Sequence, residues 1–474
     1  MQTRSPSGFT GLRATIALAA SAAILFGACS SAGTSAPVAS QAAAPAASQS
    51  VASQAAGGVA SAAASTTASA TPNLSGTISV LEKWPEPQYA PYFQTLVKNY
   101  EALHPQVHID LQAVADQPIK DKLRVLTAAG QLPDIFFSWA GDFTAKYVQA
   151  GLVADLTSAV MDTSWKNTYA AGALAAATYN GKLYGIPIDL DAKFMAYNKA
   201  IFAAHNWSVP TSMAELLTLC DTIKAAGIQP ISFGNVYGWP AIHYLTQLNA
   251  YYVPPATLNQ DYNPATGAFT DPGYLQALQT FQAIDQHCLT PGANGITHDQ
   301  AVTNFVQGKA AMMYVEQADF PSFTAAQGAP AAFVNNWDFF QLPFPAGAAG
   351  SATTLEGAPD LFLVNAKTQH MDIVLNFLQY FSNLQNAEQM VNQLNWLSPV
   401  LGSATTANTF PQNIKALDAI NKTSNMAIWL DTVTNINVAT AYLNGAEALI
   451  GGTETPQQVL KDVQAAAAKA KANP

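Results

Sequence analysis

The sequence predicts an α/β fold with enough length for two lobes that have separate hydrophobic cores. From Gly76 onward, short β-branched runs alternate with amphipathic helical segments, a pattern typical of parallel strands joined by crossover helices. The body from about Leu74 to Pro474 is longer than one core usually supports. Two tryptophans, Trp84 and Trp139, follow expected strands, and ligands of open α/β sheets gather at such ends.

The first elements can be placed in order from their hydrophobic patterns. A strand is expected over 77–81, and a helix over 92–104, where five large apolar side chains share one face before Pro105 stops it. The next strand is expected over 107–111, a second helix over 119–130 and a third, buried strand over 133–137. The terminal glycine of the second helix is typical of a helix end.

The first 28 residues are predicted to be a lipoprotein signal peptide. Arg4 and Arg13 precede an apolar run over 14–26, which is too short to cross a bilayer and ends in two small residues. Cys29 follows them, and this ending resembles a bacterial lipobox, in which the cysteine is acylated. The alternative is an ordinary cleaved signal with a chance cysteine. Either reading sends the chain out of the cytoplasm.

Residues 29–73 are predicted to be a disordered tether. The stretch is almost entirely Ala, Ser, Thr, Gly, Pro and Gln, without the charge or the periodic apolar residues that a packed core needs. No later run is apolar for eighteen residues. We therefore expect the body to work on the extracytoplasmic face of the cell membrane, held there by its lipid.

Charge and cysteine content narrow the function classes. The net charge is −10 with only 11% charged residues, which argues against nucleic acid and favours a neutral ligand. Beyond Cys29, only Cys220 and Cys288 remain; they form either one disulfide or two buried thiols. The seven histidines show no metal-ligand spacing, and no nucleotide or zinc motif is present. We expect neither metal nor cofactor.

A set of short segments carries a family resemblance. In chain order these are 84–85 (WP), 132–136 (LPDIF), 152–156 (LVADL), 179–187 (YNGKLYGIP), 195–199 (MAYNK), a helix through Cys220, 305–313 (FVQGKAAMM) and 396–399 (WLSP). Their order resembles the solute-binding proteins of ABC sugar importers, the maltose-binding-protein-like family. Trp396 and Ser398 depart from the family's glycine-then-leucine-proline stretch.

The resemblance implies a two-lobed clamp that closes on its ligand about a hinge of crossing strands. It places lobe 1 at 74–189 plus 358–403 and lobe 2 at 190–357 plus 404–474. It also implies a monomer that captures a neutral mono- or oligosaccharide and delivers it to ABC permease subunits.

Sugars offer flat C–H faces that pack on aromatic rings. The aromatic candidates are Trp84, Trp139, Tyr237, Trp239, Trp396 and Trp429. Relatives place a ligand-contacting aromatic in the loop that holds Trp239. Trp429 has an alternative as a core residue of an amphipathic helix. Trp165, Trp207 and Trp337 are expected to be packing residues.

Sugar hydroxyls need planar donors and acceptors. The polar candidates are Asp142, Asp189, Asp191, Glu316, Gln317 and Glu356, and less favoured Glu82 and Glu86, for which a solvated turn is the alternative. Alternation along a crossing strand would send Asp189 and Asp191 to one side; an exposed hinge edge is the alternative. Asp134 is expected to anchor local backbone.

Other functions remain open at this point. The same clamp could take a polyamine, a polyol phosphate or a peptide, although a phosphate calls for convergent Arg or Lys, which the candidate segments lack. A secreted glycoside hydrolase would need two carboxylates across a cleft, such as Asp189 with Glu316 or Glu356. A pure adhesion protein has no feature of its own here. The ordered resemblance favours a binder, not an enzyme.

Overall fold

The computed structural model describes residues 73–423 and 426–472. The predicted signal peptide, the predicted acylation site Cys29 and the predicted tether up to residue 72 lie outside the described residues. Everything described belongs to the unit Thr71–Pro474. Within the described ranges, no helix is long and apolar enough to cross a bilayer.

The first sheet gathers strands from two distant parts of the chain. Its order is β2 (Val107–Ala113), β1 (Gly76–Glu82), β3 (Ile135–Trp139), β12 (Asp360–Val364) and β6 (Gly185–Pro187). The first three strands are parallel, and β12 runs antiparallel to both of its neighbours. The three strands predicted from sequence are therefore confirmed, although β3 begins two residues later than expected. The carboxyl ends of β1 and β3 meet at one edge.

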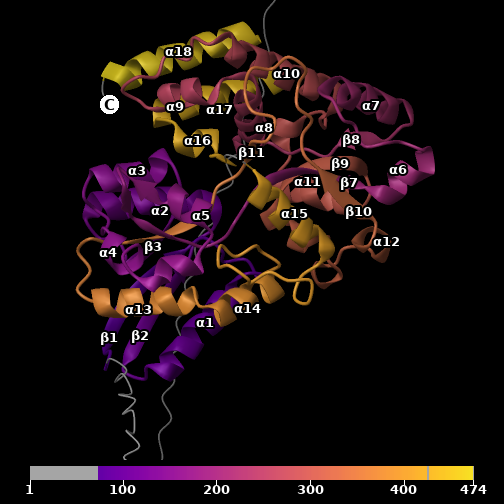
Figure 1. The fold of residues 1–474 in the computed structure, drawn as a ribbon. Coiled ribbons are helices and arrows are strands. Elements are labelled where there is room, and N and C mark those ends of the chain that lie inside the picture. Colours follow the sequence, from indigo (N-terminus) through magenta and orange to yellow (C-terminus); the bar gives the residue numbers. More distant parts are fainter. Residues whose placement is uncertain (1–72, 424–425, 473–474) are drawn as a thin grey trace, which may run out of the picture. The chain divides into compact units, whose positions relative to one another are not determined.

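Helices from both ends of the chain cover this sheet. They are α1 (Ala90–Leu103), α2 (Asp116–Ala129), α3 (Asp142–Gln149), α13 (Met371–Phe381) and α14 (Leu384–Leu394). Figure 1 shows the late helices α13 and α14 beside the early α1. Gly130 caps α2 with a φ of 65°, a conformation that glycine adopts without steric cost. Short elements complete this part: α4 (Thr157–Val160), η1 (Ser164–Thr168), α5 (Ala171–Ala176), β4 (Thr178–Tyr179) and β5 (Lys182–Leu183).

The second sheet lies within the middle of the chain. Its order is β10 (Trp337–Phe340), β7 (Lys193–Asn198), β9 (Ala310–Glu316) and β8 (Gln229–Ile231). Only β8 and β9 are parallel. A separate two-stranded piece pairs β11 (Leu355–Glu356) with β13 (Met426–Ala427). The first six residues of β9 are buried.

The second sheet is surrounded by the remaining helices. These are α6 (Lys199–His205), α7 (Met213–Ala225), α8 (Trp239–Tyr252), α9 (Pro255–Tyr262), α10 (Pro272–Cys288), α11 (His298–Val306), α12 (Ala331–Val334), α15 (Pro411–Lys422), α16 (Leu430–Val433), α17 (Ile436–Ile450) and α18 (Pro456–Ala472), with η2 (Ala293–Gly295), η3 (Gln317–Phe323) and η4 (Ala325–Gln327). In Figure 1 the C-terminal helices α17 and α18 lie together, and both pack against α10.

Each sheet has its own hydrophobic core. One cluster of buried side chains surrounds the first sheet and includes Phe136, Phe137 and Trp396. Two others surround the second sheet, one around Leu245 and one around Phe320. This arrangement is the two-lobed α/β fold that the sequence predicts.

The segment 188–192 connects the two sheets, and it is not the strand that we expected. No ladder forms there because its amides bond to other connecting segments. Ile188 N donates to Asp360 O at 2.8 Å, and Leu190 N donates to Leu397 O at 2.6 Å. Gln317 N donates to Ala192 O at 3.0 Å. An irregular connection, held by these three backbone hydrogen bonds, therefore joins the lobes.

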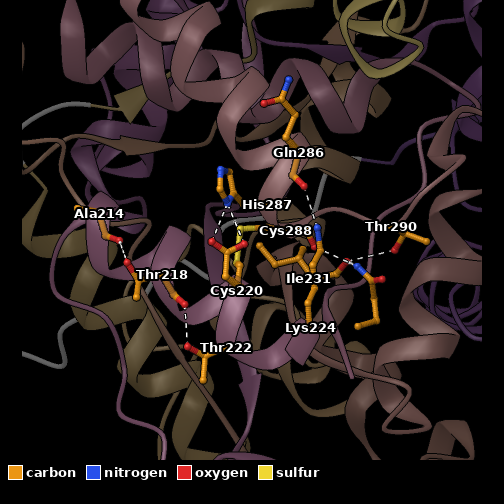
Figure 2. The surroundings of a disulfide bond; sticks show 12 residues. Ala214, Thr218, Cys220, Thr222, Lys224, Ile231, Gln286, His287, Cys288 and Thr290 are labelled. Atoms are coloured by element: carbon orange, nitrogen blue, oxygen red, sulfur yellow. Dashed lines mark hydrogen bonds and ion pairs between the residues drawn. A yellow bond between two sulfur atoms is a disulfide. The ribbon is translucent and has the colours of Figure 1, made fainter. Parts of the chain in front are cut away.

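A disulfide joins α7 to the end of α10, the pairing that the sequence left open. Cys220 and Cys288 are both fully buried, with Cα atoms 5.1 Å apart. Beside the bond, His287 Nδ1 lies 2.8 Å from Asp221 Oδ1, and Lys224 Nζ donates to Gln286 O at 2.8 Å (Figure 2). The cross-link closes a loop between residues 68 positions apart, which restricts the unfolded chain.

Replacing both disulfide cysteines, Cys220→Ala with Cys288→Ala, should destabilise the fold. In the chain-entropy account, a loop of this length contributes roughly 4 kcal/mol to the free energy of unfolding. Thermal unfolding should show a clearly lower Tm for the double variant. Dithiothreitol should lower the Tm of the parent protein and leave the variant unchanged. Equal Tm values for the two proteins would contradict a stabilising role for the bond.

Candidate ligand-binding cavity

One cavity of the described structure, here called the main cavity, has a volume of about 760 Å³. It lies where the carboxyl ends of β1, β3 and β9 approach the connecting segment 188–192 and the first turn of α8. Nine of the twelve predicted ligand-binding residues line it: Trp84, Trp139, Asp189, Asp191, Tyr237, Trp239, Glu316, Trp396 and Trp429. Segments far apart in the sequence therefore converge on one space.

Aromatic rings form one wall of the main cavity. Trp84 stacks on Phe93, with ring centroids 5.2 Å apart and planes 3° apart, and its ring lies 5.0 Å from Trp396. Trp139 packs edge-on against Phe137. These lining tryptophans are more than 90% buried, so their rings are held by the core. Such fixed rings lose little conformational entropy when a ligand packs on them.

A second aromatic group surrounds Trp239, the half-buried first residue of α8. His243 lies one turn further along α8; its ring centroid is 5.0 Å from Trp239 and 4.4 Å from Trp429. His298, at the start of α11, places its ring 4.6 Å from Trp239 on another side. Two histidines therefore hold Trp239, and exposed Tyr237 lies beside it at the mouth.

Lysines and carboxyl groups pair within the cavity wall. Lys83 Nζ lies 2.8 Å from Asp360 Oδ2 and 3.7 Å from Asp116 Oδ1. Although burial acts to lower it, these two carboxylates raise the pKa of Lys83 above its ordinary value. Burial raises the pKa of Asp360 to about 6 in spite of the lysine. Lys120 Nζ lies 5.0 Å from the Trp139 ring.

Glu316, the last residue of β9, is held as a carboxylate. Burial opposes its ionisation, but Lys193 Nζ at 3.8 Å and His243 Nδ1 at 3.2 Å hold the pKa of Glu316 below its ordinary value. Burial lowers the pKa of His243 to about 4, so this imidazole is neutral at pH 7. Asp319 lies on η3, which follows β9, and its Oδ1 is 3.0 Å from His298 Nε2 on α11.

Asp189 and Asp191 occupy the connecting segment between the sheets. Both are more than 90% buried, and both line the main cavity. Asp189 Oδ1 accepts a hydrogen bond from Asp360 N at 2.9 Å, and Asp191 Oδ1 accepts one from Ala318 N at 3.3 Å. Burial, with repulsion from Asp360, raises the pKa of Asp189 to about 8. Burial also raises the pKa of Asp191, and Glu316 adds to the effect.

Three predicted residues lie elsewhere. Asp142 begins α3 and forms an ion pair with Lys146 at 2.8 Å. Gln317 Nε2 donates to Asn395 O at 2.9 Å, inside the wall behind the cavity. Glu356 is fully buried, and Tyr314 Oη donates to its Oε2 at 3.0 Å. None of the three lines the main cavity, because each is already committed to a structural contact.

Of the two less favoured candidates, Glu86 lies in a turn and is partly exposed, whereas Glu82 is not a solvated turn residue. Glu86 lines the main cavity. Glu82 ends β1 and is only 1% exposed, and its Oε2 accepts a hydrogen bond from the backbone N–H of Trp84. Burial raises the pKa of Glu82 to about 7, partly opposed by that hydrogen bond. The side chain therefore supports the backbone that carries Trp84.

Sequence reasoning missed several polar residues of the wall. They are Lys83, Lys120, His243, His298, Asp299, Asp319, Asp360 and Asp431. Lys83 is adjacent to Trp84 in the motif, and His243 follows Trp239 by one helical turn, so both could have been found from spacing to an aromatic candidate. Asp134, by contrast, bonds to Ser79 and Thr368, which confirms its predicted role as a backbone anchor.

The sequence profile of the bacterial extracellular solute-binding proteins matches residues 84–388, more than half of the 474 residues. The chain belongs to this family. Three sequence relatives illustrate the similarity of this solute-binding protein. A binding protein of Brucella abortus is 28% identical over 278 residues, or 56% of this chain and 62% of the relative. The chain therefore matches less than two thirds of that relative's length.

Two further relatives carry more specific names. An ABC transporter extracellular-binding protein of Pyrococcus horikoshii is 24% identical over 318 residues, which cover 66% of this chain and 67% of the relative. The multiple sugar-binding protein of Streptococcus mutans is 24% identical over 302 residues, which cover 60% and 67%. Among solved structures, a chitin oligosaccharide binding protein superposes with a TM-score of 0.76 at 21% identity, over 84% of this chain and all of that one. This last similarity establishes the fold of the solute-binding protein.

The buried Glu82 predicts a pH-dependent stability. Its folded pKa of about 7 exceeds the ordinary 4.5, so the stability that neutral Glu82 contributes is complete below pH 4.5 and is lost as the pH rises through about 7. Glu82→Gln, neutral throughout, should exceed the parent's free energy of unfolding above pH 7 by up to about 3 kcal/mol and match it near pH 4. Urea unfolding at both pH values tests this. Glu388→Gln, on the exposed face of α14, is the control; a pH-independent difference for Glu82→Gln would contradict the assignment.

Proposed function

We propose that this protein is the lipid-anchored, substrate-binding component of an ABC transporter, capturing a mono- or oligosaccharide for a membrane permease. The observation that carries the proposal is the main cavity itself, in which fixed tryptophans face carboxyl groups between two α/β lobes. Sugars are recognised by this combination of aromatic faces and planar polar groups.

Trp239 is the aromatic residue best placed to contact a sugar. It is the least buried of the five lining tryptophans, and His243 and His298 fix its ring from two sides. Trp84, Trp139 and Trp396 belong to the core of the first sheet and give a second aromatic surface. The lobes would close around a sugar ring because the sugar binds the closed form of the protein more tightly than the open form.

The relatives support the sugar and the transporter. The names of two of them state multiple sugar binding and membership of an ABC transporter, and a structural neighbour is named for chitin oligosaccharides. A neutral sugar is the reference ligand because the chain as a whole carries few charges. Polyol phosphates fit poorly, because acidic residues outnumber lysines in the cavity wall.

The hydrolase alternative is weakened by the position of Glu356. A pair of Asp189 with Glu356 would need both carboxyl groups at the ligand, and Glu356 is buried outside the lining. Asp189 with Glu316 remains as a pair. Recovery of a bound sugar unchanged after long incubation tests this alternative directly.

Trp239→Ala should weaken sugar binding by about 1 to 3 kcal/mol, because the lost ring supplies packing area. The ligand is first identified by a thermal-shift screen with mono- and oligosaccharides, polyamines, glycerol phosphates and short peptides. A ligand at a hundredfold its Kd adds about 2.7 kcal/mol to stability. Isothermal titration then compares the variant with the parent.

The matched control for this substitution is Trp207→Ala. Trp207 follows α6 and packs on His205, outside the cavity lining. Its loss should leave the affinity unchanged. An unchanged affinity in a folded Trp239→Ala variant would remove Trp239 from the ligand site, and a shift only with a non-sugar would overturn the sugar.

Cys29→Ala should release the protein from the membrane. If Cys29 carries the lipid, the variant retains an export signal but no anchor, and fractionation of cells should move it from the membrane to the soluble extracytoplasmic fraction. Metabolic labelling with a fatty acid should mark the parent only. Cys220→Ala with Cys288→Ala is the control, because it keeps Cys29; membrane retention of the Cys29 variant would contradict lipid anchoring.

A further inference from the structure

The wall of the main cavity is far more charged than the chain. Charged residues make up 11% of the sequence, but 9 of the 36 lining residues are Asp or Glu and only 2 are Lys. A neutral sugar leaves this excess of acidic groups uncompensated. Desolvated charges of one sign are costly unless a counter-charge arrives.

Of the lysines near the cavity, Lys83 and Lys193 each lie beside a carboxyl group, and Lys120 lies 5.0 Å from the Trp139 ring. Lys83 lies against Asp360 at 2.8 Å, and Lys193 lies 3.8 Å from Glu316, which also has His243 at 3.2 Å. These contacts account for two of the buried carboxyl groups. His298 serves a third, Asp319 on η3, at 3.0 Å.

Asp191 is left without a cation. Asp191 lines the cavity and is only 8% exposed. Oδ1 accepts one weak hydrogen bond, from Ala318 N at 3.3 Å, and no residue of 73–423 or 426–472 donates to Oδ2 or forms an ion pair with it. Asp189 beside it bonds only to the backbone N–H of Asp360. A buried carboxyl group in the wall of an aromatic cavity therefore lacks an ion-pair partner among the described residues.

We propose that the sugar which this cavity takes carries a protonated amine, and that Asp191, assisted by Asp189, receives the ammonium group. This inference rests on the proposed sugar-binding function and specifies its ligand as an amino sugar or an oligosaccharide that contains one. An ammonium would supply three donors and a positive charge to the Asp191 carboxyl group, which forms no ion pair with a described residue. The tryptophans would hold the neighbouring C–H faces.

The charged surroundings of Asp191 make the pairing sensitive to pH. The groups that face it are Glu316 on β9, Asp319 on η3, Asp360 on β12 and Asp189 on its own segment. Burial and these carboxyl groups favour the protonated form of Asp191 in the empty cavity. On arrival of an ammonium group, the carboxyl O–H gives its proton to solvent and the carboxylate remains with the cation. Binding of the amino sugar should therefore release protons, whereas binding of a neutral sugar should not.

The test compares three ligand series on the full chain in detergent at pH 6.5, where the sugar amines are protonated. The probes are β-1,4-linked glucosamine di- and tetrasaccharides, their N-acetylated counterparts, and cellobiose and cellotetraose; spermidine is included. Titration calorimetry in two buffers of different ionisation enthalpy gives affinity and proton release. The glucosamine series should bind at least about tenfold more tightly than the others, with proton release.

Asp191→Asn should remove that preference together with the proton release. Asp338→Asn is the matched control, because it deletes the same charge on β10, outside the cavity lining. It should keep the preference. If Asp191→Asn does not fold, the ligand series and the proton release still decide.

Each result has a defined meaning. Equal or tighter binding of the N-acetylated or neutral sugars overturns the amine inference and leaves the sugar function intact. Binding of spermidine with no saccharide overturns both. An equal loss in Asp338→Asn and Asp191→Asn overturns the assignment to Asp191.

Discussion

The backbone hydrogen bonds of the segment 188–192 are the constraint on which the rest of the site depends. The segment joins β6 of one sheet to β7 of the other. Its backbone N–H groups at Ile188 and Leu190 donate to Asp360 O and Leu397 O, where the chain passes between the sheets again. Gly357 approaches this segment so closely that a Cβ there would collide with Asp191 O. Three connections are therefore packed backbone to backbone, and side chains that leave them enter the space between two cores.

That packing explains why the acidic residues of the site are buried and remain polar. Asp189 and Asp191 cannot turn to solvent without breaking the connection, so burial raises their pKa values. Glu316, at the end of a sheet strand, has Lys193 directly across the ladder and is held ionised instead. The cavity wall therefore holds two kinds of carboxyl group. Asp189 and Asp191 are protonated more readily than usual, and Glu316 is held as an anion.

Much of the fold, and part of the site, could be predicted from the sequence because these depend on local pattern. β-Branched runs and terminal glycines specify the strands and helices of the first sheet within a few residues, and Trp84 and Trp139 follow strand ends that meet at one edge. Glu356 and Gln317 show the limit. Their polar side chains have partners far away in the chain, Tyr314 and Asn395, and no spacing reveals such a pairing.

The same limit explains the missed charges of the cavity. The composition is an average over the whole chain. A low fraction of charged residues predicts a neutral ligand only if those residues are spread evenly over the protein. They are not, because 9 of the 36 residues that line the cavity are Asp or Glu. Such a concentration in a desolvated wall is stable only with counter-charges in place. Where the chain supplies Lys83 and Lys193, that requirement is met internally, and at Asp191 our proposal assigns it to the ammonium group of the ligand.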